Sequence, residues 1–176
     1  TETFVALKAH IDNWRWAGVP FFLRTGKRMG DKVAEIVIQF REVPHAVFPV
    51  AGGVAAGNRL VIRLQPEEDI RLYLMAKEQG NVMKVKPTYL SLDFCQVFEG
   101  RRTEAYERLL LDVIDGKLSL FMRRDELVAA WEWVTPIMQA WAEQAEPPQA
   151  YAAGTWGPEA ATVLLQKNGV KWHENT

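Results

Sequence analysis

The sequence contains one cysteine, Cys95, and three histidines among its 176 residues. A single cysteine excludes an internal disulfide and any metal site built on several cysteines. The histidines stand at positions 10, 45 and 173, and their spacing fits no ligand or triad signature; HExxH, CxxC and GxSxG are all absent. The usual sequence signals for metal hydrolysis and nucleophile-elbow chemistry are therefore missing, and we expect no metal.

The chain also lacks a surplus of charge of either sign. Its 21 Lys and Arg are matched by 22 Asp and Glu, so the formal net charge is -1. Nothing in this balance drives binding to a phosphate backbone or to an anionic membrane. No apolar run approaches the roughly 20 residues of a membrane helix, and the N-terminus has no signal-peptide pattern. We expect a cytoplasmic protein that binds neither nucleic acid nor membranes.

Two nucleotide-binding motifs are missing as well, since neither GxxxxGK[ST] nor GxGxxG occurs. A dinucleotide fold cannot be built from these residues. The chain begins with Thr-Glu-Thr-Phe rather than Met, and its first residues already alternate like a strand. The sequence therefore predicts a fragment of a longer protein.

The first hundred residues show mainly the period of two that is typical of strands. The predicted strands are Thr3–Ile11, Val19–Leu23, Ala34–Arg41, Leu60–Leu64, Ile70–Ala76 and Tyr89–Phe98. The short connection after Leu23 predicts that the second and third strands pair with each other in antiparallel fashion.

Helical spacing takes over after Gly100. One helix is predicted around Ala105–Val113 behind a Thr103 cap, with Gly116 at its end. A longer helix starts near Asp125 and runs to the Pro147-Pro148 pair, and a short last helix lies between Pro158 and Gly169. Strands first and helices afterwards predict an α+β fold, a large mainly antiparallel sheet with helices packed on one face, as a single domain over residues 1–176.

The densest charge feature is Arg24-Thr-Gly-Lys27-Arg28-Met-Gly-Asp-Lys32, with four cations in nine residues. Such a segment could hold a phosphate, because lysine supplies mobile charges and Gly26 and Gly30 allow backbone N–H groups to approach. The alternative is a solvated hairpin turn, in which Lys, Gly and Asp are common, and composition alone favours this alternative.

The segment 58–66 also has two possible interpretations. Arg59, Val61, Arg63 and Gln65 fall on one side of a predicted strand, which could line a ligand cleft. Such a side is more often the wet face of a sheet or a polar face that meets a partner. The seven tryptophans are not interleaved with a basic stripe, so they indicate core and interface packing rather than base stacking.

Several longer motifs carry a resemblance to a known family. The run Trp14-Arg-Trp-Ala-Gly-Val-Pro-Phe-Phe-Leu-Arg-Thr-Gly-Lys27 resembles the R-W-x-G-V-P-F-x-L-R-x-G-K segment of glucose-6-phosphate dehydrogenases. Further landmarks agree in order and spacing: Asn58-Arg-Leu-Val-Ile-Arg-Leu-Gln-Pro66, Ala105-Tyr-Glu-Arg-Leu-Leu-Leu-Asp112, Arg124-Asp-Glu-Leu127, Ala130-Trp131 and Gly157-Pro158. The resemblance covers essentially the whole chain.

The resemblance implies the C-terminal domain of that enzyme, which carries the subunit interface in the family. The family's Gly-rich coenzyme fingerprint, its R-I-D-H-Y-L-G-K motif and its general-base histidine belong to an N-terminal part that is not in this chain. No catalytic residue can therefore be assigned here. The residues that would select NADP or NAD belong to the same missing part.

Individual site residues follow from the same resemblance. Lys27 and Lys32 match positions that contact the sugar phosphate, and Gln65 matches a glutamine near the substrate. Arg24 and Arg63 match positions that help hold a second, structural NADP in animal members. Val33 and Trp156 stand where those members have cations, which weakens the case for such a site.

The resemblance thus implies that the whole protein oxidises glucose 6-phosphate to 6-phosphoglucono-lactone with NADP, the first step of the pentose phosphate pathway. This chain would supply sugar-phosphate contacts and the interface of a homodimer or tetramer, and by itself it would be inactive because it lacks the base and the coenzyme fold. The alternative is a non-catalytic dimerisation module.

Overall fold

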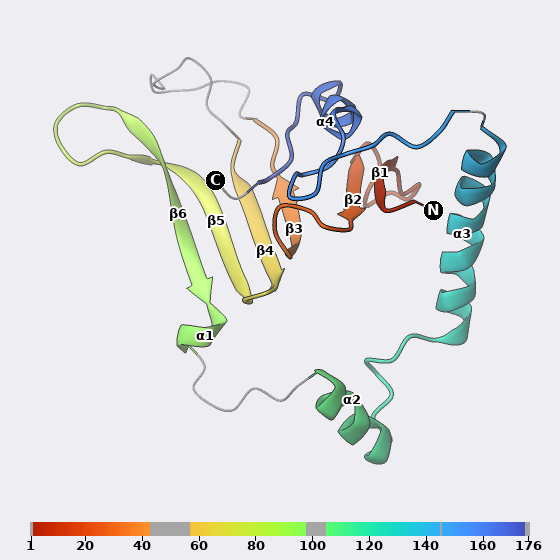
Figure 1. The fold of residues 1–176 in the computed structure, drawn as a ribbon. Coiled ribbons are helices and arrows are strands. Elements are labelled where there is room, and N and C mark those ends of the chain that lie inside the picture. Colours follow the sequence, from red (N-terminus) through yellow and green to blue (C-terminus); the bar gives the residue numbers. More distant parts are fainter. Residues whose placement is uncertain (1, 43–56, 98–104, 145, 175–176) are drawn as a thin grey trace. The chain divides into compact units, whose positions relative to one another are not determined.

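A computed structural model describes residues 2–42, 57–97, 105–144 and 146–174. The chain divides into two compact units, one made of Thr1–Glu99 with Ala150–Thr176 and the other of Gly100–Gln149. The first unit contains every strand that the structure describes, together with two of the helices (Figure 1).

Six strands form two antiparallel sheets in the first unit (Figure 1). The smaller sheet pairs β1 (Phe4–Ala9) with β2 (Phe21–Gly26). The larger one has the order β3 (Ala34–Gln39), β4 (Arg59–Gln65), β5 (Asp69–Lys77) and β6 (Val85–Asp93). The predicted α+β class with mainly antiparallel pairing is confirmed.

The predicted pairing of the second and third strands is wrong. β2 pairs with β1, whereas β3 pairs with β4, and the two strands belong to different sheets. A short connection normally favours a hairpin, but here the backbone groups of the connection bond to a distant segment of the chain.

The strand expected over Tyr89–Phe98 ends earlier than predicted. β6 stops at Asp93 and α1 (Phe94–Val97) follows. A carboxylate oxygen of Asp93 accepts a hydrogen bond from the backbone N–H of Cys95 at 2.8 Å, a local bond that competes with strand continuation. Phe98 lies outside the described residues.

The larger sheet has one apolar and one polar face, as the alternation in its strands predicts. Cross-strand neighbours on the apolar face form two rows, Ile36–Ile62–Ile70–Leu92 and Ile38–Leu60–Leu72–Leu90. The polar face carries the rows Glu35–Arg63–Asp69 and Gln39–Arg59–Tyr73–Tyr89, with Val61 between them, 1% exposed.

Local sequence signals place the helices. α2 (Ala105–Ile114) is followed by Gly116 at φ +69°, whose N–H donates to the carbonyl of Val113. α3 (Arg124–Glu143) begins where a Glu126 carboxylate accepts a hydrogen bond from the backbone N–H of Arg123 at 2.9 Å. α4 (Glu159–Gln166) follows Pro158 as expected. The predicted cap Thr103 lies outside the described residues.

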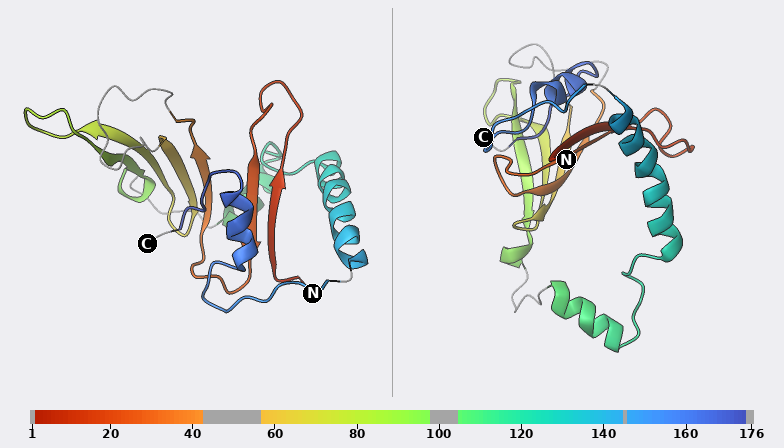
Figure 2. Two further views of the ribbon diagram at one scale, coloured as in Figure 1. Left: turned by 90° about the horizontal axis from the view of Figure 1, so that it is seen from above. Right: turned by 45° about the vertical axis from the view of Figure 1, so that its right-hand side comes forward.

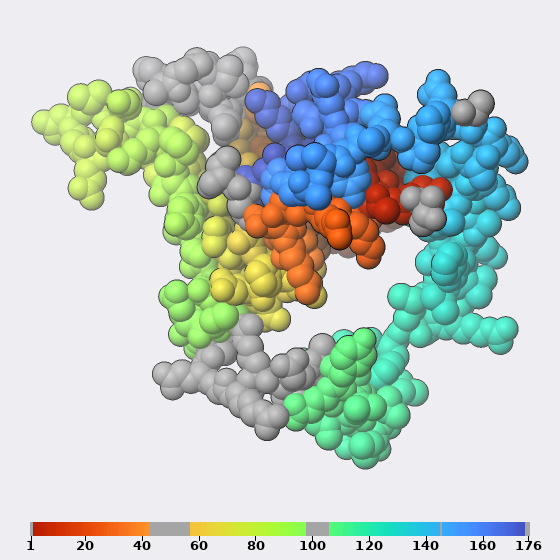
Figure 3. All heavy atoms as spheres, viewed as in Figure 1, coloured from red at the N-terminus to blue at the C-terminus, as the bar shows by residue number. Residues whose placement is uncertain are grey.

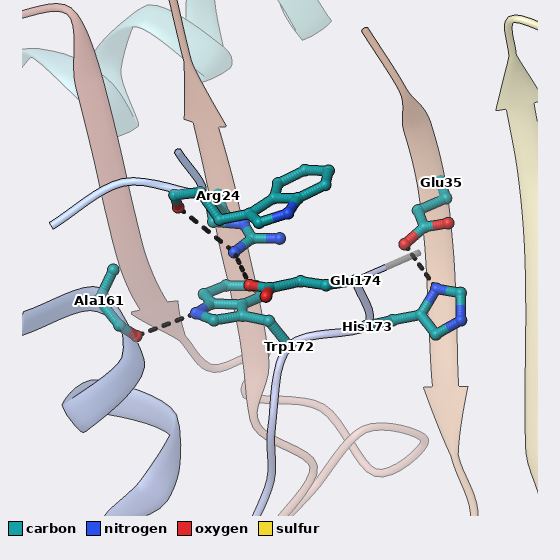
Figure 4. A network of polar contacts seen from close by, with 7 residues as sticks. Arg24, Glu35, Ala161, Trp172, His173 and Glu174 are labelled. Atoms are coloured by element: carbon teal, nitrogen blue, oxygen red, sulfur yellow. Dashed lines mark hydrogen bonds and ion pairs between the residues drawn. The ribbon is translucent and has the colours of Figure 1, made fainter. Parts of the chain in front are cut away.

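The segment Val170–Glu174, the C-terminal clasp, runs beside β2 and β3 after α4 (Figures 2 and 4). The Arg24 guanidinium on β2 stacks between Trp156 and Trp172, at 4.9 and 4.4 Å from the ring centroids, and lies 2.9 Å from a Glu174 carboxylate oxygen. Trp172 Nε1 also donates to the carbonyl of Ala161 in α4 at 3.0 Å.

The clasp also contacts the larger sheet. His173 Nδ1 lies 2.8 Å from the Glu35 carboxylate of β3. The clasp therefore links α4 to both sheets.

Replacing Trp172 with Ala should destabilise the fold, because it removes half of the stack on Arg24 and the bond to α4. We expect the free energy of unfolding to fall by about 2–4 kcal/mol, measured by chemical denaturation. Trp14→Ala is the matched control, since Trp14 is 92% exposed. Equal losses in the two variants would contradict a structural role for the clasp.

Candidate functional site

The turn between β2 and β3 carries the cations that the sequence singled out. Lys27 directly follows the end of β2, and Lys32 stands two residues before Ala34, the first residue of β3. Gln65, the last residue of β4, is the cross-strand partner of Ala34. The structure therefore brings the three predicted substrate residues to this one turn and the strand end beside it.

The backbone of this turn is held by the loop Ala150–Gly157, which we call the Trp156 loop. The N–H of Gly154 donates to the carbonyl of Arg28 at 2.8 Å, and the N–H of Gly30 donates to the carbonyl of Thr155 at 3.1 Å. The Trp156 ring lies so close to Gly30 that a Cβ there would be 3.3 Å from it. In Figure 3 the pale-blue atoms of this loop lie against the orange atoms of the turn.

The N-terminal end of the turn is fixed too. The N–H of Lys27 donates to the carbonyl of Thr3 at 2.8 Å, and the Tyr151 hydroxyl lies 2.6 Å from the carbonyl oxygen of Lys27. Phe4 fills the space that a Cβ on Gly157 would need, and Gly157 has a φ of +105°, so this position in the Trp156 loop requires glycine. The turn is therefore anchored by residues from both ends of the chain.

The cationic side chains of the turn contrast with its fixed backbone. Lys27, Arg28 and Lys32 are all exposed, and none of their charged groups has a hydrogen bond or ion pair to another described residue. The two ammonium groups of Lys27 and Lys32, on a turn with a fixed backbone, can pair with the oxygens of an anion such as a phosphate.

Arg24 and Arg63, by contrast, are already committed to the fold. The Arg24 side chain is 10% exposed between its two tryptophans and beside Glu174. Arg63 Nη2 lies 3.7 Å from a carboxylate oxygen of Glu35. A nucleotide phosphate placed on these arginines would meet the two carboxylates, so the residues present do not fit a second, structural NADP.

Charged groups on the polar face of the larger sheet also pair among themselves. Arg71 Nη2 lies 2.9 Å from the buried carboxylate of Asp69. The pKa of Arg71 is raised, chiefly by its hydrogen bond to Tyr73 and also by Asp69, while burial opposes the shift. Arg71 therefore remains a cation, and we assign it no acid–base role.

Two kinds of site are absent from the described part of the chain. It contains no group of three or more His, Cys, Asp or Glu placed to hold a metal ion. None of its helices is both long enough and apolar enough to cross a membrane.

Sequence analysis missed Tyr151, whose hydroxyl touches the site. It lies 124 positions from Lys27 and follows the proline pair without any periodic pattern. The only local signal was its position three residues before Gly154-Thr-Trp-Gly157. The sequence does not indicate which segment this loop contacts.

Comparison with known proteins gives one consistent result. Residues 1–173 match the family model for the glucose-6-phosphate dehydrogenase C-terminal domain. Glucose-6-phosphate 1-dehydrogenase from Mycolicibacterium smegmatis is 53% identical over 173 residues, and that from Rhizobium meliloti is 49% identical over 175. These matches cover 98% and 99% of this chain but 35% and 36% of the relatives, so the chain spans about a third of their length.

Solved structures agree with the sequence matches. Glucose-6-phosphate 1-dehydrogenase from Mycobacterium avium superposes with a TM-score of 0.78 at 34% identity, covering 99% of this chain and 35% of that one. A glucose-6-phosphate dehydrogenase solved in complex with its substrate glucose 6-phosphate gives a TM-score of 0.83 at 34% identity, covering 98% and 35%. With its antiparallel sheets and its cationic turn, the chain belongs to the family of glucose-6-phosphate dehydrogenase C-terminal domains.

Proposed function

We propose that this chain is the C-terminal domain of a cytoplasmic enzyme that oxidises glucose 6-phosphate to 6-phosphoglucono-lactone with NADP. In this proposal residues 1–176 contribute sugar-phosphate contacts and the subunit interface, and the remaining two thirds of the enzyme contribute the coenzyme fold and the general base. The observation that carries the proposal is the fixed turn, whose two ammonium groups have no partner among the described residues, on a chain 53% identical to such an enzyme.

The turn suits the task of orienting a sugar phosphate. The lysines would pair with phosphate oxygens while the side-chain amide of Gln65 bonds to the substrate. The substrate's C1 would then lie where its hydride passes to the nicotinamide ring, and the proton of the C1 hydroxyl would pass to a base outside this chain. Orientation of this kind lowers the barrier without a catalytic group on the turn itself.

Lys27→Ala and Lys32→Ala test the proposal in the complete enzyme. Each removes one or two charge-assisted hydrogen bonds, worth roughly 1.5–3 kcal/mol, so kcat/KM for glucose 6-phosphate should fall about 10- to 100-fold. The KM for the coenzyme should stay nearly constant. Steady-state kinetics with each substrate varied in turn measures both effects.

Arg28→Ala is the matched control because Arg28 is exposed on the same turn and matches no ligand position in the family. It should change kcat/KM little. If all three variants have the kinetics and melting temperatures of the parent enzyme, the turn is a solvated surface feature and the site assignment is wrong.

We also propose that the apolar face of the larger sheet is the subunit interface. Ile36 is 50% exposed and Leu90 64% exposed on this face, and both belong to continuous rows of aliphatic side chains. A two-fold contact between identical faces is the commonest way to bury such a surface. This property also fits the alternative of a non-catalytic dimerisation module, which an open reading frame encoding a coenzyme-binding fold ahead of Thr1 would exclude.

Self-association is therefore expected at micromolar concentration, with sedimentation showing a species of two or more copies. Leu90→Glu should shift the equilibrium toward monomer, because the charge would have to be buried in the interface. Ser91→Glu is its control, on the adjacent residue and the opposite face. A clean monomer of the unaltered chain would disprove the interface.

A further inference from the structure

The Tyr151 hydroxyl is aimed at the backbone of the candidate site rather than at a ligand. Its oxygen lies 2.6 Å from the carbonyl oxygen of Lys27 and 3.1 Å from that of Thr3. A phenol has one hydrogen to donate, and the shorter distance gives it to Lys27. The ring is held in turn by Phe4, at 5.3 Å between centroids and an interplanar angle of 57°.

Both peptide groups of Lys27 are consequently fixed from outside the turn. Thr3 accepts a hydrogen bond from its N–H, and Tyr151 donates one to its carbonyl. The long side chain of Lys27 has no partner among the described residues. The backbone bonds are therefore what determines where the Lys27 ammonium group can reach.

The backbone conformation of Arg28, the residue after Lys27, depends on the hydrogen bond from Tyr151. Arg28 has a φ of +50°, in the left-handed region that residues other than glycine seldom adopt. The carbonyl of Lys27 belongs to the peptide unit that enters this conformation, and the carbonyl of Arg28, bonded to Gly154 N–H, belongs to the unit that leaves it. With the bond to Tyr151 lost, the peptide between Lys27 and Arg28 could rotate toward a commoner conformation and carry the Lys27 side chain with it.

We propose that Tyr151 is a positioning residue: its hydroxyl holds the Lys27 carbonyl and thereby sets where the Lys27 ammonium meets the substrate phosphate. This inference rests on the proposed function. Tyr151 touches neither substrate nor coenzyme in this scheme and acts only through the turn.

Tyr151→Phe in the complete enzyme tests the proposal, since it removes the hydroxyl and keeps the ring on Phe4. The KM for glucose 6-phosphate should rise about 3- to 10-fold, the loss expected for one neutral hydrogen bond. The kcat and the KM for the coenzyme should change less than twofold. Tyr106→Phe, at an exposed position of α2, should leave every constant unchanged.

The double variant Lys27→Ala/Tyr151→Phe separates positioning from a general loss of structure. If Tyr151 acts through Lys27, removing the hydroxyl should have almost no further effect once the ammonium group is gone. The same 3- to 10-fold increase in both backgrounds, or an unchanged KM in the single variant, would overturn the proposal. An unchanged KM in Lys27→Ala itself would instead refute the proposed site, so the two failures are distinguishable.

Discussion

The turn from Lys27 to Val33 leaves one sheet and enters another, so its peptide groups have no neighbouring strand to bond with. Buried or crowded peptide groups need partners, and here the Trp156 loop supplies them from the far end of the chain. A displacement of the Trp156 loop would therefore displace the turn as well. The location of the cationic side chains thus depends on backbone hydrogen bonds made by residues that carry no charge.

Arg24 holds the Trp156 loop, which in turn holds the turn between β2 and β3. A planar guanidinium suits a place between two indole rings better than an ammonium group does, because it can stack on both faces and still bond at its edge. One edge of Arg24 reaches Glu174 and the carbonyl of Trp156. These four cations therefore fall into two sets, since Arg24 and Arg63 are paired with carboxylates within the fold while Lys27 and Lys32 are exposed.

The sequence alone predicted the elements whose signal is local. Ile70, Leu72 and Leu74 alternate over β5, and the spacing of Leu127, Trp131 and Val134 marks α3. The assignment of Lys27, Lys32 and Gln65 to the substrate rests on the family resemblance and stays a prediction, because composition could not distinguish a phosphate-binding turn from a solvated one.

The pairing of elements was harder to predict. The partners β2 and β3 were mispaired because a short connection normally makes a hairpin. The Arg24–Trp156 contact joins positions 132 apart, and neither it nor the Tyr151–Lys27 bond leaves a periodic trace in the sequence. Such contacts follow from the packed structure alone, which is why Tyr151 was missed, whereas Lys27 and Lys32 stand in a charged motif that is visible in the sequence.

The position of Pro87 has a consequence for how copies of this sheet can meet. β6 is an outer strand of the larger sheet, and Pro87, opposite Met75, stands next to Lys86 in it. Proline has no N–H to offer an incoming strand, and lysine would lose its water. A foreign strand cannot extend an unbroken ladder along this edge, so growth of the sheet into a fibre is opposed there. If two copies associate as proposed, this edge would not pair them, and a face of the sheet would have to.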